Sequence, residues 1–141
     1  MIPLVLCVDD DKVALMISKL NFKKASFCSE VVTAENGREA LNYFEQQDEL
    51  AENGRKIPNL IFLDLNMPLM DGWEFLDLFA KKYGSIYPNI KIALLSSSVN
   101  PEDKIKADQN PMIFCFIDKA LGIDNLKELR QNKEVKHYFA E

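Results

Sequence analysis

The stretch Leu60-Ile61-Phe62-Leu63 is a short apolar run that ends abruptly in a carboxylate, Asp64. Its residues do not alternate with polar ones, which is typical of a parallel strand covered by helices on both faces. Pro58 separates this run from the helical pattern that precedes it. We therefore expect a central strand over 60–63, with Asp64 at its carboxyl end.

Three further apolar runs end in polar or charged side chains in the same way: 4–8 before Asp9 and Asp10, 90–95 before Ser96, and 112–117 before Asp118 and Lys119. In open α/β sheets the ligand binds outside the carboxyl ends of the strands, where loops bring together groups that lie far apart in sequence. Carboxylates, a hydroxyl and an ammonium group would meet there. A cation would offset the repulsion between the carboxylates, so the cluster favours divalent-metal and phosphoryl chemistry.

The segments between these runs carry helix signals. A first amphipathic helix is predicted to end before Ser26. Its apolar face is formed by residues at helical spacing: Val13, Met16, Ile17 and Leu20. Helix N-termini are predicted at three capping sequences: Asn36 with Glu39, Asp71 with Glu74, and Asn100 with Pro101.

The remaining signals complete a repeating pattern. Val31 and Val32 centre a short second strand, Asn53-Gly54 marks the end of the second helix, and apolar positions between Leu126 and Phe139 suggest a closing helix. Strand and helix thus alternate five times, which predicts an α/β fold with a three-layer, doubly wound parallel sheet.

Composition limits the possible functions. A chain of 141 residues that is 48% hydrophobic is expected to form one domain with a real core. The net charge is −5 and the basic residues are spread along the chain, which argues against direct binding of nucleic acid. The first residues lack a basic leader and are too short to span a membrane. We expect no membrane insertion and a cytoplasmic protein.

The cysteines fit that expectation. There are three of them, an odd number, and two lie inside apolar runs: Cys7, Cys28 and Cys115. Such cysteines are expected to be buried free thiols in a reducing compartment.

The segment Asp64-Leu65-Asn66-Met67-Pro68-Leu69-Met70-Asp71-Gly72, together with Val8-Asp9-Asp10, resembles the response regulator receiver domain family, in particular its single-domain, chemotaxis-like members. Residues 34–37, 95–97 and Lys119 also fall where that family places its turns and site residues. The resemblance implies a receiver domain over 1–141 with the flavodoxin-like strand order 2-1-3-4-5. Because the chain ends with its fifth helix, we expect a stand-alone regulator of a two-component system or phosphorelay.

The resemblance also implies a role for each site residue. Asp64 would accept a phosphoryl group from a histidine kinase or a histidine phosphotransfer protein. Asp9 and Asp10 would bind Mg²⁺ together with Asp64 and the backbone carbonyl of Asn66. Three other residues would complete the site: Lys119 and Ser96 as partners of the phosphoryl oxygens, and Phe116 as a switch residue that follows Ser96. The downstream protein target is not identified by the sequence.

Secondary roles and one departure follow from the same resemblance. Asn66 and Ser98 match positions that tune the phosphoryl lifetime, and Ser97 matches a small residue that leaves room for the group. The family usually has proline after the site lysine, whereas Ala120 follows Lys119 here. A cis bond before a non-proline residue costs roughly 2.5–4 kcal/mol, which favours the trans form here, although the sequence alone does not decide between cis and trans for the bond before Ala120.

Three functions are compatible with these residues. The first is a phosphoacceptor switch that is not a turnover enzyme, although it could dephosphorylate itself; a relay intermediate and an output switch would look alike. The second is a degenerate receiver that acts as a constitutive interaction module. The third is a phosphohydrolase with an aspartyl intermediate, as in haloacid-dehalogenase-like enzymes. Those enzymes normally carry a second aspartate two residues after the nucleophile, and the presence of Asn66 at that position argues against this function. His137 is expected on the surface without a phosphodonor role.

Overall fold

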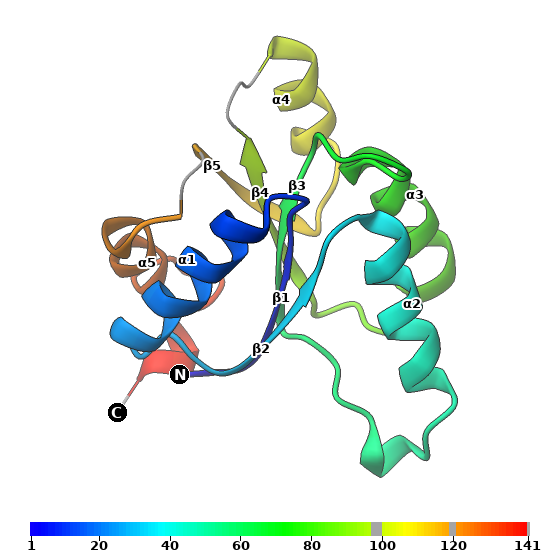
Figure 1. Ribbon diagram of the computed structural model, residues 1–141, viewed down its shortest axis with the longest axis horizontal. Helices are drawn as coiled ribbons and strands as arrows, with labels where there is room; N and C mark the ends of the chain where they lie inside the picture. Colours follow the sequence, from blue (N-terminus) through cyan, green and yellow to red (C-terminus); the bar gives the residue numbers. More distant parts are fainter. Residues whose placement is uncertain (97–99, 119–120, 141) are drawn as a thin grey trace.

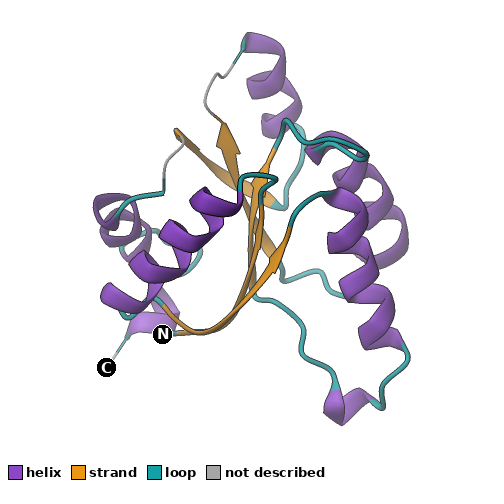
Figure 2. Cartoon of the chain, viewed as in Figure 1, coloured by secondary structure: helices purple, strands orange, loops and turns teal. Residues whose placement is uncertain are grey.

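A parallel sheet is the centre of the computed structural model, which describes residues 1–96, 100–118 and 121–140 (Figure 1). Its strands lie in the order β2-β1-β3-β4-β5, as predicted. The strands are β1 (Ile2–Val8), β2 (Cys28–Ala34), β3 (Leu60–Asp64), β4 (Lys91–Ser96) and β5 (Ile113–Asp118). All four strand pairings are parallel, so the carboxyl ends of the strands lie at the same end of the sheet, which Figure 2 shows in orange.

Helices cover both faces of the sheet. The α-helices are α1 (Lys12–Lys24), α2 (Gly37–Asp48), α3 (Gly72–Tyr83), α4 (Pro101–Asp108) and α5 (Ile123–Arg130), and two short 3₁₀ helices are η1 (Glu52–Gly54) and η2 (Lys136–Phe139). In Figure 1, α1 and α5 lie on one side of the sheet, and α2 and α3 lie on the other. The described residues therefore form the predicted three-layer α/β architecture.

The central strand β3 explains why its sequence shows no alternation. Leu60 and Phe62 point into the core on the α1 and α5 side, and Ile61 and Leu63 point into the core on the α2 and α3 side. All of them are fully buried. Burial of such side chains on both faces contributes about 1.5–3 kcal/mol per side chain relative to exposure, so this strand fixes the middle of the sheet.

The predicted helix starts are confirmed. The Asn36 side chain accepts from the Glu39 backbone N–H at 2.9 Å, and Asp71 and Glu74 form a complete capping box. Asn100 accepts from the backbone N–H of Asp103 at 2.8 Å. These caps satisfy N–H groups that have no partner within their helices.

Two predicted helix ends are wrong. The α2 helix ends at Asp48 and not at Gly54, because the Arg55 side chain binds the Asp48 and Leu50 carbonyls, at 3.2 and 3.0 Å. The predicted closing helix is two elements, α5 and η2. Between them, the Asn132 side chain accepts from the Glu134 backbone N–H at 2.9 Å, a local turn that competes with continuation of the helix.

The expected apolar face of α1 is also wrong in its orientation. The helix forms as predicted, but its buried residues are Leu15, Ser18 and Phe22. The Phe22 ring packs against the rings of Phe27 and Phe62, with centroids 5.7 and 5.4 Å apart, and this aromatic cluster holds the helix on the sheet. The stripe predicted from Val13, Met16, Ile17 and Leu20 is exposed.

The cysteines are thiols, as expected, but only Cys7 is buried. Cys28 and Cys115 are half-buried, and desolvation raises their pKa to about 11 and about 12. Both therefore stay protonated near neutral pH and are weak nucleophiles. Among the described residues, no helix is both long and apolar enough to cross a membrane.

Candidate functional site

The pairing of the strands brings the polar residues to one edge. Val8 pairs with Leu63 in the β1–β3 ladder, so Asp9 follows β1 at the level of Asp64. Asp64 pairs with Leu95 in the β3–β4 ladder, and Ser96 is one residue further along. Three segments that are distant in sequence therefore end side by side, as the sequence predicts.

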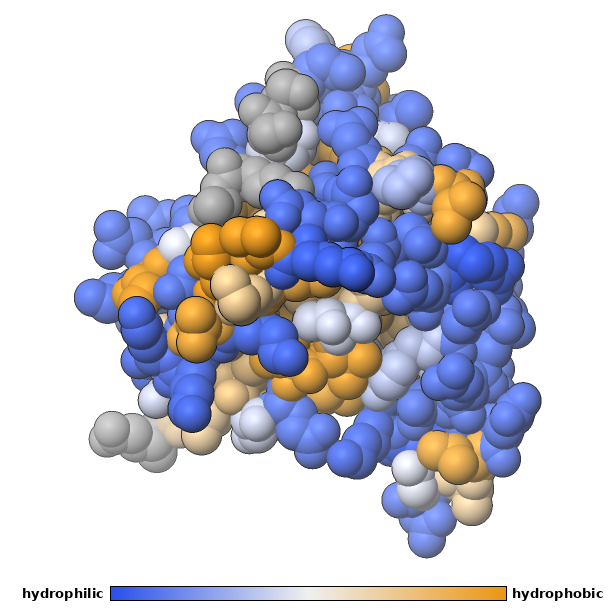
Figure 3. All heavy atoms as spheres, viewed as in Figure 1, coloured by the Kyte–Doolittle hydropathy of each residue, from blue (hydrophilic) through white to orange (hydrophobic). Residues whose placement is uncertain are grey.

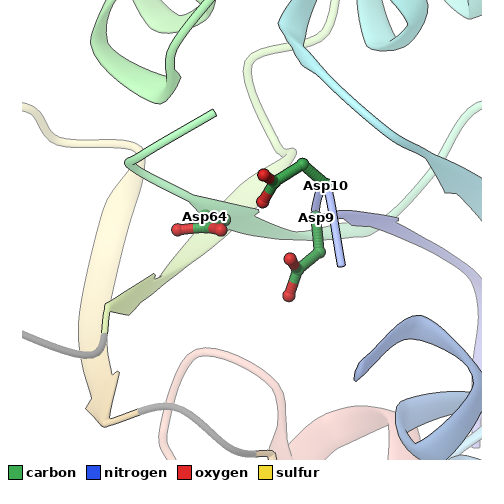
Figure 4. Close-up of side chains that lie close together, drawn as sticks. All are labelled: Asp9, Asp10 and Asp64. Atoms are coloured by element: carbon green, nitrogen blue, oxygen red, sulfur yellow. The ribbon is translucent and has the colours of Figure 1, made fainter. Parts of the chain in front are cut away.

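Three carboxylates converge at this edge: those of Asp9, Asp10 and Asp64. Each offers one oxygen, and these oxygens lie within 4.8 Å of one another. Figure 4 shows that two of these side chains come from the residues after β1 and that the third comes from the end of β3. Asp9 is only 2% exposed and Asp64 only 3%, whereas Asp10 is exposed. The cluster therefore has a buried base and one side open to solvent.

Local backbone groups hold the two buried carboxylates in place. The Asn66 backbone N–H donates to Asp64 Oδ1 at 3.1 Å, and the Asp11 backbone N–H donates to Asp9 Oδ1 at 3.0 Å. Asp11, rather than Asp9 or Asp10, caps α1, since it accepts from the backbone N–H groups of Val13 and Ala14. Helix capping therefore explains the third acid of the Asp9-Asp10-Asp11 run and not the first two.

The cluster fits a divalent cation. Six oxygen ligands at about 2.1 Å around Mg²⁺ lie about 3 Å apart when adjacent and about 4.2 Å apart when opposite. The observed oxygens lie within 4.8 Å of one another, which is close to the spacing that such a geometry requires. Hard carboxylate oxygens are also the ligand type that Mg²⁺ and Mn²⁺ prefer. Coordination by the Asn66 carbonyl stays a prediction.

The predicted switch pair lies on neighbouring strands. Ser96 is fully buried, and Phe116 is half-buried against the core on the α2 and α3 side. Leu94 pairs with Phe116 and Ser96 pairs with Asp118, so Ser96 and Phe116 side chains are on the same face of the sheet. The role of Ser96 and Phe116 as a switch pair stays a prediction.

Several predicted residues lie outside the part of the chain that the structure describes. They are Ser97, Ser98, Lys119 and Ala120. Their assignments, including the cis or trans question, stay predictions. His137 is exposed, as expected.

Two features next to the site were not singled out from the sequence. Leu69 adopts a φ of 66° and is 86% exposed, in a turn closed by the Met70 N–H and the Pro68 carbonyl at 2.7 Å. A bulky residue in this region is unusual and is often found near functional sites. Gly72 is the second feature, because its backbone lies against Asp64 itself. The sequence signal that could have identified Gly72 is its position directly after Asp71, the residue that caps α3.

Gly72→Ala is expected to destabilise the fold by about 1–3 kcal/mol, as overpacking does in a dense core. An added Cβ would lie 2.7 Å from the Asp64 carbonyl oxygen and 2.9 Å from Leu65 Cα, and both of these are backbone atoms. Gly54→Ala is the matched control, since a Cβ there meets nothing within 4 Å; its effect should stay within about 0.5 kcal/mol. Denaturant unfolding measures both, and equal stabilities would contradict this close approach.

The comparisons with known proteins agree with this site. The family model of the response regulator receiver domain matches residues 5–132. The chain therefore belongs to the response regulator receiver domain family and carries a receiver domain of two-component signalling. Members of this family are typically signalling proteins rather than enzymes that turn over an external substrate.

Individual relatives cover nearly the whole chain. The chain is 29% identical to response regulator Rcp1 from Synechocystis over 92% of this chain and 85% of that protein. A two-component response regulator structure from Cytophaga hutchinsonii has a TM-score of 0.80 at 27% identity, covering 91% of this chain and 93% of that one.

Two further similar structures are of a metal-bound and of a phosphorylated response regulator. The Mn²⁺-bound form of Rcp1 has a TM-score of 0.71 at 26% identity, covering 91% of this chain and 89% of that one. The phosphorylated cyanobacterial phytochrome response regulator RcpA has a TM-score of 0.68 at 30% identity, covering 92% of this chain and 89% of that one.

Proposed function

We propose that this chain is a phosphoacceptor switch in which Asp64 takes a phosphoryl group from a phosphohistidine of a histidine kinase or a histidine phosphotransfer protein. The observation that carries this proposal is the convergence of the three carboxylates of Asp9, Asp10 and Asp64 at the carboxyl end of the central strands. The phosphorylated relative RcpA supports it. The proposed receiver domain extends over residues 1–141.

The transfer step needs no other nucleophile. A carboxylate oxygen of Asp64 attacks phosphorus, the P–N bond to the donor imidazole breaks, and the nitrogen keeps the electron pair and picks up a proton. The Asn66 N–H bond to Oδ1 fixes the carboxylate, and burial of Asp64 limits its orientations. In-line positioning and charge stabilisation provide most of the rate in such transfers.

The three carboxylates and one backbone carbonyl form the proposed metal site. Asp9, Asp10 and Asp64, with the Asn66 backbone carbonyl, would hold Mg²⁺, and the Mn²⁺-bound relative Rcp1 supports a divalent ion here. A bound Mg²⁺ would offset negative charge on the carboxylates and on the transferred phosphoryl group. Lys119 and Ser96 would meet the other phosphoryl oxygens as charged and neutral donors.

Phosphorylation would then change the protein surface. Its added charge would draw Ser96 toward the site, and Phe116 on the same face of the sheet would turn into the space that Ser96 leaves. Such a change is a shift between two populations of the protein, biased by local charge. The proposed downstream partner is a protein that binds one of these populations better, and slow autodephosphorylation of Asp64 would reset the switch.

A transfer profile tests this function. The protein is mixed with a panel of autophosphorylated histidine kinases and histidine phosphotransfer proteins, with Mg²⁺ or with EDTA. We expect rapid transfer from a small subset of donors, only with Mg²⁺. Lack of transfer from every donor, and from phosphoramidate as well, would support the constitutive interaction module instead. Repeated turnover of an external phosphomonoester would support the phosphohydrolase.

A further inference from the structure

One side chain of α1 reaches the segment that follows β5. The Asn21 side-chain amide donates to the backbone carbonyl of Leu121 at 3.0 Å, although the two residues lie 100 positions apart in the chain. Leu121 is only 3% exposed, and a buried carbonyl without a hydrogen-bond partner is costly. This bond therefore joins α1 to the connection between β5 and α5.

Asparagine is an unusual residue at this place on the helix. It lies within α1, where an asparagine side chain competes for backbone hydrogen bonds and lowers helix stability. Figure 3 shows apolar side chains gathered over α1 at the surface, so here an amide contacts the protein while several apolar residues face solvent. Because this arrangement reverses the usual pattern, local helix formation does not explain Asn21.

The bonded carbonyl lies at one end of a short connection. β5 ends at Asp118, which is paired in the sheet, and the Leu121 side chain is buried in the core on the α1 and α5 side. The backbone N–H of the next residue, Gly122, donates to a side chain of α5 at 2.9 Å. Both ends of the connection are therefore anchored, and only Lys119 and Ala120 lie between them.

We propose that Asn21 is a positioning residue for phosphoryl transfer: by holding the Leu121 carbonyl, it sets the place from which Lys119 reaches the phosphoryl oxygens. This inference rests on the proposed function, in which Lys119 meets those oxygens. Asn21 is not part of the carboxylate cluster, so it acts through the backbone of the connection. A misplacement of about 1 Å at a reacting centre can cost about a hundredfold in rate, so a lost anchor should be measurable.

The residue after Lys119 explains why such an anchor is needed. An alanine can adopt many backbone conformations, whereas a proline would fix φ at about −65°. This chain has Ala120, so a restraint on the connection has to come from contacts with other elements. The bond from Asn21 to the Leu121 carbonyl is a restraint of this kind.

The test measures phosphorylation by phosphoramidate in the presence of Mg²⁺. Asn21→Leu keeps the size of the side chain and removes the amide donor, and we expect the rate to fall by about tenfold. Asn21→Ala, a second variant without a donor, should lose as much. The Mg²⁺ dissociation constant of both variants should equal that of the wild type, because the proposed metal ligands are unchanged.

Arg130→Met is the matched control. Arg130 also donates to a backbone carbonyl, that of Ala25 at 3.0 Å, and so also joins α5 to the end of α1. Arg130 is the last residue of α5, whereas Leu121 lies just before that helix. Loss of this second bond should leave the phosphorylation rate at the wild-type value, even if it lowers the stability of the fold.

A double-mutant cycle shows whether the loss acts through the lysine. Lys119→Gln should itself slow phosphorylation, and adding Asn21→Leu to it should cause no further loss, because the group that Asn21 positions is already gone. Asn21→Gln, which keeps an amide donor, should retain more of the wild-type rate than Asn21→Leu.

The outcomes separate this inference from the proposed function. A wild-type rate in Asn21→Leu, an equal loss in Arg130→Met, or the same tenfold loss when Lys119→Gln is already present would overturn the positioning role and leave Asp64 as the acceptor. Weaker Mg²⁺ binding in Asn21→Leu would overturn it as well. A wild type that phosphoramidate does not phosphorylate would instead overturn the proposed function.

Discussion

Asp64→Asn is expected to abolish phosphoryl uptake from phosphoramidate, with a rate at least about a thousandfold below that of the wild type, because an amide oxygen is a poor nucleophile. Intact-protein mass spectrometry after incubation with Mg²⁺ measures the result. The wild type should gain the mass of one phosphoryl group, and the gain should be lost in acid or base because acyl phosphates hydrolyse readily. The variant should gain nothing.

The Asp64→Asn variant should also remain folded. Asp64 shares the cluster with two other carboxylates, so removing its charge relieves repulsion in the absence of metal. We expect its free energy of unfolding without Mg²⁺ to equal or exceed that of the wild type. Asp77→Asn, an exposed aspartate on α3, is the control for uptake and should react like the wild type. A mass gain in Asp64→Asn equal to that of the wild type would place the acceptor elsewhere.

The second large effect is expected on metal binding. Replacing both Asp9 and Asp10 by asparagine removes two of the three carboxylates that converge, and we expect the Mg²⁺ dissociation constant to rise by about a hundredfold or more, since Mg²⁺ depends on charged oxygen ligands. Calorimetric titration measures this constant. Mg²⁺ should also raise the melting temperature of the wild type, because it binds the folded state, and not that of the double variant.

A matched control sharpens the metal experiment. Asp124→Asn removes an exposed carboxylate in the first turn of α5, outside the cluster. It removes one carboxylate, as each of the two substitutions in the double variant does, without touching the proposed ligands, so its Mg²⁺ affinity should equal that of the wild type. If the Asp9 and Asp10 double variant also bound Mg²⁺ as well as the wild type, the metal would have to be held by other residues.

Much of this molecule follows from local sequence. The unbroken apolar run before Asp64 predicts a strand buried on both faces, and parallel strands that end in acids place Asp9 beside Asp64 without knowledge of any long-range contact. The caps at Asn36 and Asp71 are equally local, because each side chain binds an N–H group three residues away.

Other features depend on contacts that periodicity does not contain. Helical spacing predicts one apolar face of α1 but not that the sheet covers a different face, and here Phe22 decides this through its packing against Phe27 and Phe62. The end of α2 depends on Arg55, which reaches back to carbonyl groups from a later loop. The place of Lys119 stays a prediction from the resemblance to the family.

The most direct test of the central claim is a crystal structure of the protein with Mg²⁺ and beryllium trifluoride, which mimics a phosphoryl group on a carboxylate. We predict the beryllium on a carboxylate oxygen of Asp64, and a metal ion about 2.1 Å from oxygens of Asp9 or Asp10, Asp64 and the Asn66 backbone. Ser96 and Lys119 should contact the fluorine atoms. A structure in which Asp64 stays unmodified, or in which the metal binds away from Asp9 and Asp10, would contradict this account.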